Sequence, residues 1–272
     1  MDIICSIIAG IIQGVTEFLP ISSSGHLVLF HQLVEFEVLN DLLFDVVLHL
    51  GTLISLLIYF RKDIGKYIIA FFQSFAKWQL RDNLDQRLAW FIVIGTIPAV
   101  VLGYFLDNIF ENFFRQTYWV AIMLILVAIL FYVLEKIAPK NKDFSALNVK
   151  NTLMIGLAQA IALIPGVSRS GITILAGMGS GLTRQMAARF SFLLSIPVVL
   201  GAGLKKSLEM TSYSLDAATT GVLVAGFLAS AIAGYVCIKY FLRYLQKNTL
   251  KPFAIYRIFL ALVVFGYFYI FR

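Results

Sequence analysis

Long apolar segments recur along this chain, and short polar stretches separate them. A helix needs about 20 consecutive apolar residues to cross a hydrocarbon core of ~30 Å, because each residue advances it by about 1.5 Å. Segments that meet this requirement fill most of the chain and leave no room for a separate soluble domain. We therefore predict an all-α polytopic membrane protein with six transmembrane helices, formed by residues 1–272 as a single membrane domain. The six candidate spans are 41–60, 88–106, 118–134, 186–204, 219–241 and 253–271.

The composition supports a membrane protein and argues against other classes. Apolar residues make up 60% of the chain and charged residues 14%, against about 25% charged in typical soluble domains. The net charge of +7 could suggest nucleic acid, but the basic residues flank the apolar segments, as topology signals do. We expect the membrane bilayer, and no nucleic acid, as a partner. Cys5 and Cys237 lie in apolar segments far apart, which predicts neither a disulfide framework nor a metal site.

Basic residues are distributed unequally between the loops. The loops at 61–87, 136–150 and 239–251 hold 14 Lys or Arg, and those at 107–117 and 205–216 hold 3. The positive-inside rule places the first group in the cytoplasm, so both termini face outward. No Lys or Arg precedes Arg61, so the first apolar segment lacks the basic n-region of a signal peptide and we expect it to be retained.

Two further apolar segments are interrupted, and we call them hairpin A (residues 3–34) and hairpin B (residues 152–183). In hairpin A the run from Ile3 to Ile12 is too short to cross, and Pro20 breaks the helix before a second apolar stretch begins. Non-helical backbone at membrane depth is tolerated only where protein or a water-filled cavity surrounds it. We therefore predict two re-entrant helical hairpins that border a buried polar pocket.

The two hairpins carry the same residues at one constant spacing, which indicates an internal repeat. Residues 1–150 and 151–272 each contain one hairpin and three crossings, and an odd number of crossings places the two repeats in opposite orientations. This predicts an inverted-topology repeat whose hairpin tips meet near the midplane. The matched pairs are Gln13 with Gln159, Ser22 with Ser168, Ser24 with Ser170, Gly25 with Gly171, and the stretch 95–104 with 226–235.

The hairpin tips have the chemistry of an anion site. Ser22, Ser23, Ser24 and Gly25 precede a helix, so hydroxyls, free backbone N–H groups and the positive end of the helix dipole meet there. Hairpin B repeats this arrangement and adds Arg169, whose guanidinium fork matches phosphate oxygens. A Ser/Gly-rich turn can also serve close helix packing alone, but its repetition at two facing tips favours phosphate binding.

Ionisable side chains beside these tips suggest catalysis. Glu17 and His26 supply a carboxylate and an imidazole, the groups that transfer a proton or orient a nucleophile. The alternatives are a structural ion pair for Glu17 and Arg169 and a structural histidine at position 26. Other polar residues lie in or beside the apolar segments. Asp45, His49 and Thr52 share one helix face and either line the cavity or bond a neighbouring helix; His31 lacks such company; and Arg257 is expected to pair or to snorkel.

These motifs resemble those of the undecaprenyl-pyrophosphate phosphatase family linked to bacitracin resistance, and the resemblance covers the whole chain. It is carried by Gln13-x-x-x-Glu17 followed by Ser-Ser-Ser-Gly-His26, and by Pro165-Gly166-x-Ser168-Arg169-Ser170-x-x-Thr173. It implies a multi-pass enzyme of the bacterial inner membrane that hydrolyses undecaprenyl pyrophosphate to undecaprenyl phosphate and inorganic phosphate. This reaction recycles the lipid carrier for peptidoglycan synthesis, in a cleft open to the periplasm.

The resemblance also assigns roles to residues of this sequence. It makes Glu17, His26 and Arg169 essential, and it makes Ser23 the candidate nucleophile, with water as the alternative. The expected phosphate ligands in hairpin B are Ser168, Ser170 and Thr173. The expected substrate-binding residues in hairpin A are Gln13, Ser22, Ser24 and Gly25. We expect Glu17 to orient His26. Many members have Glu where this chain has Gln13, so no metal ligands are assigned, and a divalent cation, Mg²⁺ or Ca²⁺, stays open as a cofactor. A homodimer also stays open.

Two other classes of protein share some of these features. Inverted repeats with broken helices also build secondary transporters, so a transporter or flippase of a phosphate-bearing lipid is the alternative function. Transport needs the anion site but neither a nucleophile nor a proton-transfer group, so Glu17 and His26 favour an enzyme. A purely structural scaffold is the third class, and the cost of placing charge inside a membrane argues against it.

The charge distribution leads to a test of topology. We expect tags at both termini to be accessible from the periplasm, and a cysteine at Lys77 to stay unlabelled by a membrane-impermeant reagent in intact cells. A cysteine at Glu111, in the sparsely charged loop, is the matched control and should react. Labelling at position 77 without labelling at position 111 would contradict the predicted orientation and indicate the opposite one.

Overall fold

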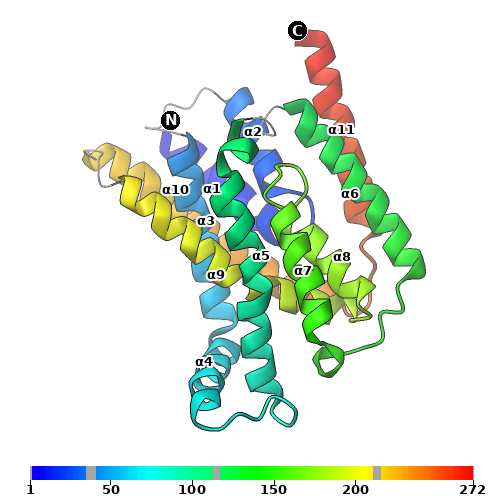
Figure 1. Cartoon of the computed structure of the whole chain (residues 1–272). Coiled ribbons are helices and arrows are strands. Elements are labelled where there is room, and N and C mark those ends of the chain that lie inside the picture. The colour runs from blue at the N-terminus through cyan, green and yellow to red at the C-terminus, as the bar shows by residue number, and fades with distance from the viewer. Residues whose placement is uncertain (1, 35–40, 113–116, 211–215, 272) are drawn as a thin grey trace.

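The computed structural model describes residues 2–34, 41–112, 117–210 and 216–271, and within these ranges the chain is helical with no named strand. One isolated bridge pairs Lys142 with Leu182. The elements are shown in Figure 1. In chain order they are α1 (Asp2–Phe18), α2 (Ser23–Leu33), α3 (Asp41–Tyr59), α4 (Arg61–Ala76), α5 (Leu84–Asn112), α6 (Thr117–Ile137), the 3-10 turn η1 (Phe144–Ala146), α7 (Val149–Ile161), α8 (Arg169–Gly179), α9 (Arg184–Met210), α10 (Ala217–Tyr244) and α11 (Lys251–Phe271).

Several of these helices are long and apolar enough to cross a membrane. Among the described residues, four helices qualify alone: α5, α6, α9 and α10. A fifth candidate is the pair α3 and α4, which qualify together but are bent by 80°. The all-helical, multi-pass class predicted from the sequence is therefore confirmed, and the number of six spans stays a prediction.

Helix α4 corrects the sequence prediction, which made residues 61–87 a cytoplasmic loop. The chain bends at Phe60 and continues as a helix from Arg61 to Ala76. The many charges obscured an apolar stripe at helical spacing, in which Tyr67 and Ala70 are buried. Side chains on other positions of α4, such as Ile68, Phe72 and Phe75, are exposed, which is typical of a helix in contact with lipid.

The two halves of the chain exchange their packing partners. Helix α1 packs against α10, whereas α7 packs against α5, and α6 lies beside α11 at one edge of the molecule (Figure 1). Both exchanged contacts rest on paired glycines: a Cβ on Gly10 would collide with the carbonyl oxygen of Gly226, and a Cβ on Gly156 would lie 2.5 Å from that of Gly95. Small residues let helix backbones approach closely in membrane proteins.

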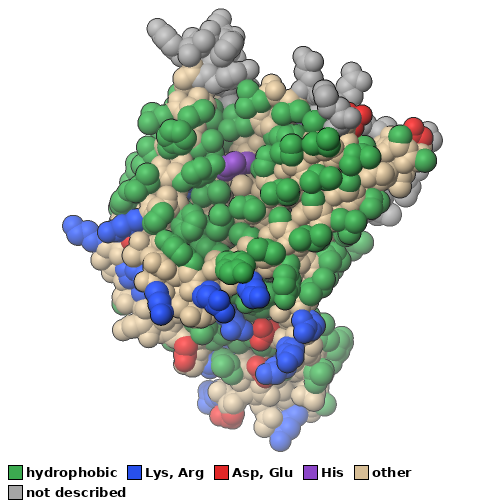
Figure 2. Space-filling model, turned by 180° about the vertical axis from the view of Figure 1, so that it is seen from behind, with side chains coloured by type: hydrophobic (Ala, Val, Ile, Leu, Met, Phe, Trp, Pro, Cys, Tyr) green, Lys and Arg blue, Asp and Glu red, His purple; other side chains and the backbone are tan. Residues whose placement is uncertain are grey.

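Charge and apolar surface are segregated on the outside of the molecule. The start of α1 and the end of α11 lie at the same end of the bundle, opposite α4 (Figure 1). Figure 2 shows Lys and Arg side chains gathered over the lower part of one face, and apolar side chains covering the part above them. This is the pattern of a protein that is embedded in a bilayer with one basic end.

A buried carboxylate fixes the basic end of the bundle. The side chain of Glu135, at the end of α6, is 1% exposed and accepts hydrogen bonds from Arg184 Nε and Nη2, at 2.8 and 2.6 Å, and from the backbone N–H of Leu250 at 2.7 Å. Lys140 pairs with the same carboxylate. Glu135 therefore joins the end of α6 to the starts of α9 and α11.

Candidate active site

Each of the two interrupted segments consists of a helix, a break and a second helix, and their re-entrant course in a membrane stays a prediction. Hairpin A consists of α1 and α2, and hairpin B of α7 and α8. The second helix of each is capped by a serine of positive φ: Ser22 at 75° and Ser168 at 73°. This conformation is strained for a residue with a side chain, by about 1–3 kcal/mol. Its occurrence at two repeat-related positions indicates that the fold imposes it.

The caps have the same geometry at the two tips. The Ser22 hydroxyl accepts a hydrogen bond from Gly25 N at 3.3 Å, and that of Ser168 accepts one from Gly171 N at 3.1 Å. Each cap hydroxyl also lies 3.3 Å from that of the serine two residues on, Ser24 or Ser170. The tips touch, since Ser170 donates to the Leu19 carbonyl at 3.2 Å. The tips therefore meet, as the sequence predicts, and their position at the midplane of a membrane stays a prediction.

Glu17 lies where the two tips meet. Arg169 Nη2 donates to its Oε1 at 2.6 Å, and the Ser23 hydroxyl donates to its Oε2 at 2.6 Å. Gln13 Nε2 adds a bond to Oε2 at 3.1 Å. The side chains of Glu17 and Arg169 are 8% and 15% exposed. Serine, carboxylate and guanidinium, which come from both hairpins, thus form one connected group.

Helix α9 holds the nitrogen of the Arg169 guanidinium that does not bind Glu17. Arg169 Nη1 donates to the carbonyl of Ser191 at 3.3 Å. The Ser191 hydroxyl lies 2.6 Å from that of Thr173, whose Oγ1 also donates to the Arg169 carbonyl at 2.7 Å. Ser191 was not singled out in the sequence, because nothing in a long apolar helix marks the turn that faces a distant hairpin.

The histidine next to Glu17 differs from the one we expected. The described hydrogen bonds of His26 go from Nδ1 to the Ser22 carbonyl and between Nε2 and the Tyr256 hydroxyl, each at 2.7 Å. A carbonyl only accepts, so Nδ1 carries a proton, and in the neutral ring Nε2 accepts from Tyr256. The two rings stack with their centroids 5.7 Å apart. Glu17 therefore does not orient His26.

His49 takes the place beside Glu17. Its Nε2 lies 3.6 Å from Glu17 Oε2, and its Nδ1 donates to the Asp45 carbonyl at 2.7 Å. The two readings of this face of α3 both apply, to different residues: His49 reaches the site, whereas Asp45 binds His31 Nε2 of the neighbouring helix at 2.8 Å.

Arg257 connects both hairpins to the last helix, which the sequence did not predict. Its side chain is fully buried, at 0% exposure. All its described hydrogen bonds go to backbone carbonyls, so the expectation that it pairs or snorkels is wrong. The acceptors are Pro20 at 3.2 Å, Gly166 at 2.8 Å, Val167 at 3.2 Å, Met123 at 3.3 Å and Leu124 at 3.2 Å. Three of these five belong to the hairpin breaks.

The group around Glu17 provides few ligands for a metal ion. Among the described residues, no three or more His, Cys, Asp or Glu side chains form a metal-binding group. Gln13 Oε1 is buried without a described partner, but both Glu17 oxygens are already bonded to Arg169, Ser23 and Gln13. Divalent Mg²⁺ and Ca²⁺ prefer several available oxygens, so these residues alone do not fit either ion.

The fold and the site together define a class: a multi-pass helical membrane protein with a buried polar site where two interrupted helices meet. Comparison with known proteins gives the family. The family model for the bacitracin resistance protein BacA matches residues 6–263. This chain belongs to the BacA family.

Curated relatives carry one enzyme name. The chain is 44% identical to the undecaprenyl-diphosphatase of Alteromonas mediterranea, over 95% of this chain and 96% of that protein. It is 43% identical to undecaprenyl-diphosphatase 1 of Pseudoalteromonas translucida, covering 97% and 99% of the two chains. It is 44% identical to the undecaprenyl-diphosphatase of Geobacter sulfurreducens, covering 98% of each.

The contacts of Arg257 lead to a stability prediction. Arg257→Lys keeps the charge but has too few donors for carbonyls on both hairpins and α6, so we expect a loss of about 3 kcal/mol in unfolding free energy. Thermal melting in detergent measures it. Arg243→Lys, at an exposed position of α10, is the control and should melt with the wild type. Equal melting of both variants would contradict the structural function of Arg257.

Proposed function

We propose that this protein hydrolyses undecaprenyl pyrophosphate to undecaprenyl phosphate and inorganic phosphate, and so recycles the lipid carrier of peptidoglycan synthesis. The observation that carries the proposal is the connected group of Ser23, Glu17 and Arg169 at the meeting point of the two hairpins. Membership of the BacA family and the shared name of relatives 43–44% identical to this chain support the same activity.

Charge explains how the site would hold this substrate. A pyrophosphate brings two to three negative charges, and Arg169 and the N-termini of α2 and α8 supply the positive counterpart. The hydroxyls of Ser22, Ser168 and Thr173 are used for capping and for the Ser191 contact. We propose that they shape the two cradles, which are the anion sites at these N-termini, while the free backbone N–H groups there and the Ser24 hydroxyl face the phosphates. Ser170 instead joins the two tips, since it donates to the Leu19 carbonyl.

Ser23 and Glu17 have the geometry of a nucleophile with its base. The Ser23 hydroxyl already donates to Glu17 Oε2 at 2.6 Å, so the carboxylate can take the proton as Oγ attacks the terminal phosphorus. The new Oγ–P bond replaces the bond to the bridging oxygen, and undecaprenyl phosphate leaves. Water then hydrolyses the phosphoserine and releases phosphate. Direct attack by water, with the same base, is the alternative.

The remaining polar groups have supporting functions in this proposal. Arg169 leaves Oε1 of Glu17 to meet the transferring phosphoryl group, where its two-point fork spreads over the equatorial oxygens. His49 Nε2 lies 3.6 Å from Glu17 Oε2, and we propose that it exchanges with Glu17 the proton that comes from Ser23. His26 and Tyr256 form a second proton-bearing pair, which we assign to the leaving oxygen.

We further propose the finer topology: six spans, two re-entrant hairpins, an inverted repeat of residues 1–150 and 151–272, and a cleft that opens to the periplasm. The exchanged pairs of helices support it, because α1 meets α10 as α7 meets α5. The paired glycines behave likewise, since Gly10 and Gly156 are repeat-related and contact the repeat-related Gly226 and Gly95. The basic end of the surface supports an inner-membrane location with that end in the cytoplasm (Figure 2).

A transporter or flippase of a phosphate-bearing lipid is less well supported. Transport requires the cradles and Arg169, but it gives no reason for a serine hydroxyl bonded to a carboxylate at 2.6 Å. The relatives compared above are named as diphosphatases.

Phosphate release from undecaprenyl pyrophosphate by detergent-purified protein tests the enzyme. Arg169→Lys keeps charge but loses the fork, so we expect turnover to fall by on the order of 10² or more. Arg169→Ala should be nearly inactive, and Ser23→Ala should lose turnover while still binding substrate. Arg243→Lys is the control. A wild type without phosphate release, but with lipid-phosphate movement in vesicles, would favour the transporter.

A pair of amide and acid exchanges separates the functions of Gln13 and Glu17. Glu17→Gln removes the carboxylate that accepts from Ser23 and pairs with Arg169, so we expect activity to be abolished. Gln13→Glu should keep activity, because the exchange removes only the Nε2 donor to Glu17 Oε2, while the shorter bonds from Ser23 and Arg169 to that carboxylate stay. Equal loss in both variants, measured as phosphate release at saturating substrate, would contradict this division.

A further inference from the structure

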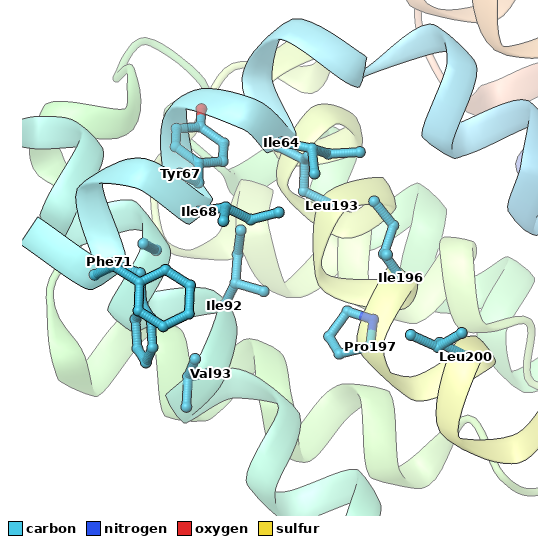
Figure 3. A pocket seen from close by; sticks show the side chains of 12 residues that line it. Ile64, Tyr67, Ile68, Phe71, Ile92, Val93, Leu193, Ile196, Pro197 and Leu200 are labelled. Atoms are coloured by element: carbon cyan, nitrogen blue, oxygen red, sulfur yellow. The ribbon is translucent and has the colours of Figure 1, made fainter. Parts of the chain in front are cut away.

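An apolar slot lies on the outside of the bundle, away from the Glu17 group. It has a volume of about 290 Å³, lies between α4, α5 and α9, and is lined by apolar side chains and the ring of Tyr67. Figure 3 shows side chains of the three helices facing one another across it, and the Tyr67 oxygen pointing away from them. Its residues are Ile64, Tyr67, Ile68, Phe71, Phe72, Ala89, Ile92, Val93, Leu193, Ile196, Pro197 and Leu200.

A basic pocket adjoins one end of this slot. It has a volume of about 390 Å³ and is lined by residues of α4 and α9, with the end of α3 and part of α10. Along α9 the lining residues continue from Gln185 and Arg189 in the pocket to Leu193, Ile196 and Leu200 in the slot, at spacings of one helix face. The pocket and the slot thus lie in succession along one face of α9, and we call the two together the channel, with a basic end and an apolar end.

The basic end has more positive than negative charge. Arg61, Lys62, Lys66 and Arg189 line it, and Asp63 is its one acidic residue. Asp63 pairs with Arg189 at 3.0 Å, and Arg61 caps the Ile58 carbonyl. Lys62 and Lys66 are exposed and have no carboxylate partner among the described residues. Two ammonium groups therefore face a space large enough for a headgroup.

The length of the channel selects the kind of tail. Arg189 and Leu200 are separated by eleven helical residues, which is about 16 Å and roughly half of a ~30 Å hydrocarbon core. An acyl chain of one leaflet has this reach, whereas a ~55-carbon isoprenoid exceeds it several-fold. Helix α4 turns by 80° from α3, and we take it as an interfacial helix whose lysines lie at headgroup level.

We propose that this channel binds an anionic phospholipid of the leaflet at the basic end of the protein, with its phosphate at Lys62 and Lys66 and an acyl chain along α9. The site is separate from substrate hydrolysis and does not depend on it. Juxtamembrane Lys and Arg each contribute about 1 kcal/mol to attraction for anionic lipid, so the two lysines favour such a lipid over a zwitterionic one.

Native mass spectrometry of the detergent-purified protein, with added phosphatidylglycerol or phosphatidylcholine, tests the proposal. We expect the wild type to retain phosphatidylglycerol preferentially and the Lys62→Gln/Lys66→Gln variant to retain it at least tenfold less. Lys77→Gln/Lys150→Gln removes the same charge at exposed positions outside the channel and should behave as the wild type. An equal loss in both variants would mean diffuse attraction to the basic surface and would overturn the site.

The apolar end has its own pair of variants. Val93→Trp fills the slot and should weaken phosphatidylglycerol retention, whereas Val101→Trp, at an exposed position of α5 outside the slot, should not. Displacement of the lipid by inorganic phosphate at equal concentration would show that the headgroup alone binds, and would overturn the acyl-chain site. Equal retention of the two lipids by the wild type would overturn the anionic selectivity.

Discussion

The buried guanidinium of Arg257 is the interaction on which the centre of this protein depends. A charge in a low-dielectric interior costs several kcal/mol unless strong dipoles surround it. Here five backbone carbonyls provide those dipoles, and three of them come from the breaks in hairpins A and B. The carbonyls in the breaks have no helical N–H donor, so the guanidinium supplies their hydrogen bonds while they stabilise its charge. One side chain thereby satisfies two interrupted helices at once.

The reactive group follows from this arrangement. With the breaks held, Ser22 and Ser168 can adopt positive φ and turn the N-termini of α2 and α8 toward a common point. Glu17 and Arg169 then meet across the hairpins at 2.6 Å, with Ser191 of α9 fixing the guanidinium from behind. Most of the site is thus pre-organised, which is the condition under which electrostatic stabilisation of a phosphoryl group is effective.

Sequence reasoning found the parts of the site that local chemistry marks. Pro20 and the serine clusters predicted the breaks and caps, and the repeat predicted that Arg169 would meet hairpin A. It failed where neighbours in space are distant in sequence. His26 lies nine residues from Glu17, but the start of α2 turns it toward Tyr256, and His49 of α3 takes its place.

Two other misses have the same origin. Arg257 looked like a lone charge because its partners are backbone atoms, which a sequence does not distinguish. The region 61–76 looked like a loop because its charges were counted before its apolar stripe. In both cases the missing information was which side of a helix faces which neighbour.

The exchange of partners between the two halves bears on how the protein is assembled during synthesis. Helix α1 emerges first, but its close-packed partner α10 emerges near the end, and α5 must wait for α7. The first hairpin therefore lacks its main packing partner until the second half of the chain has been made. Severed at residue 150, neither fragment would retain the glycine contacts that seat its hairpin. Two fragments made together in one membrane could restore these contacts, because each carries the surface that the other lacks.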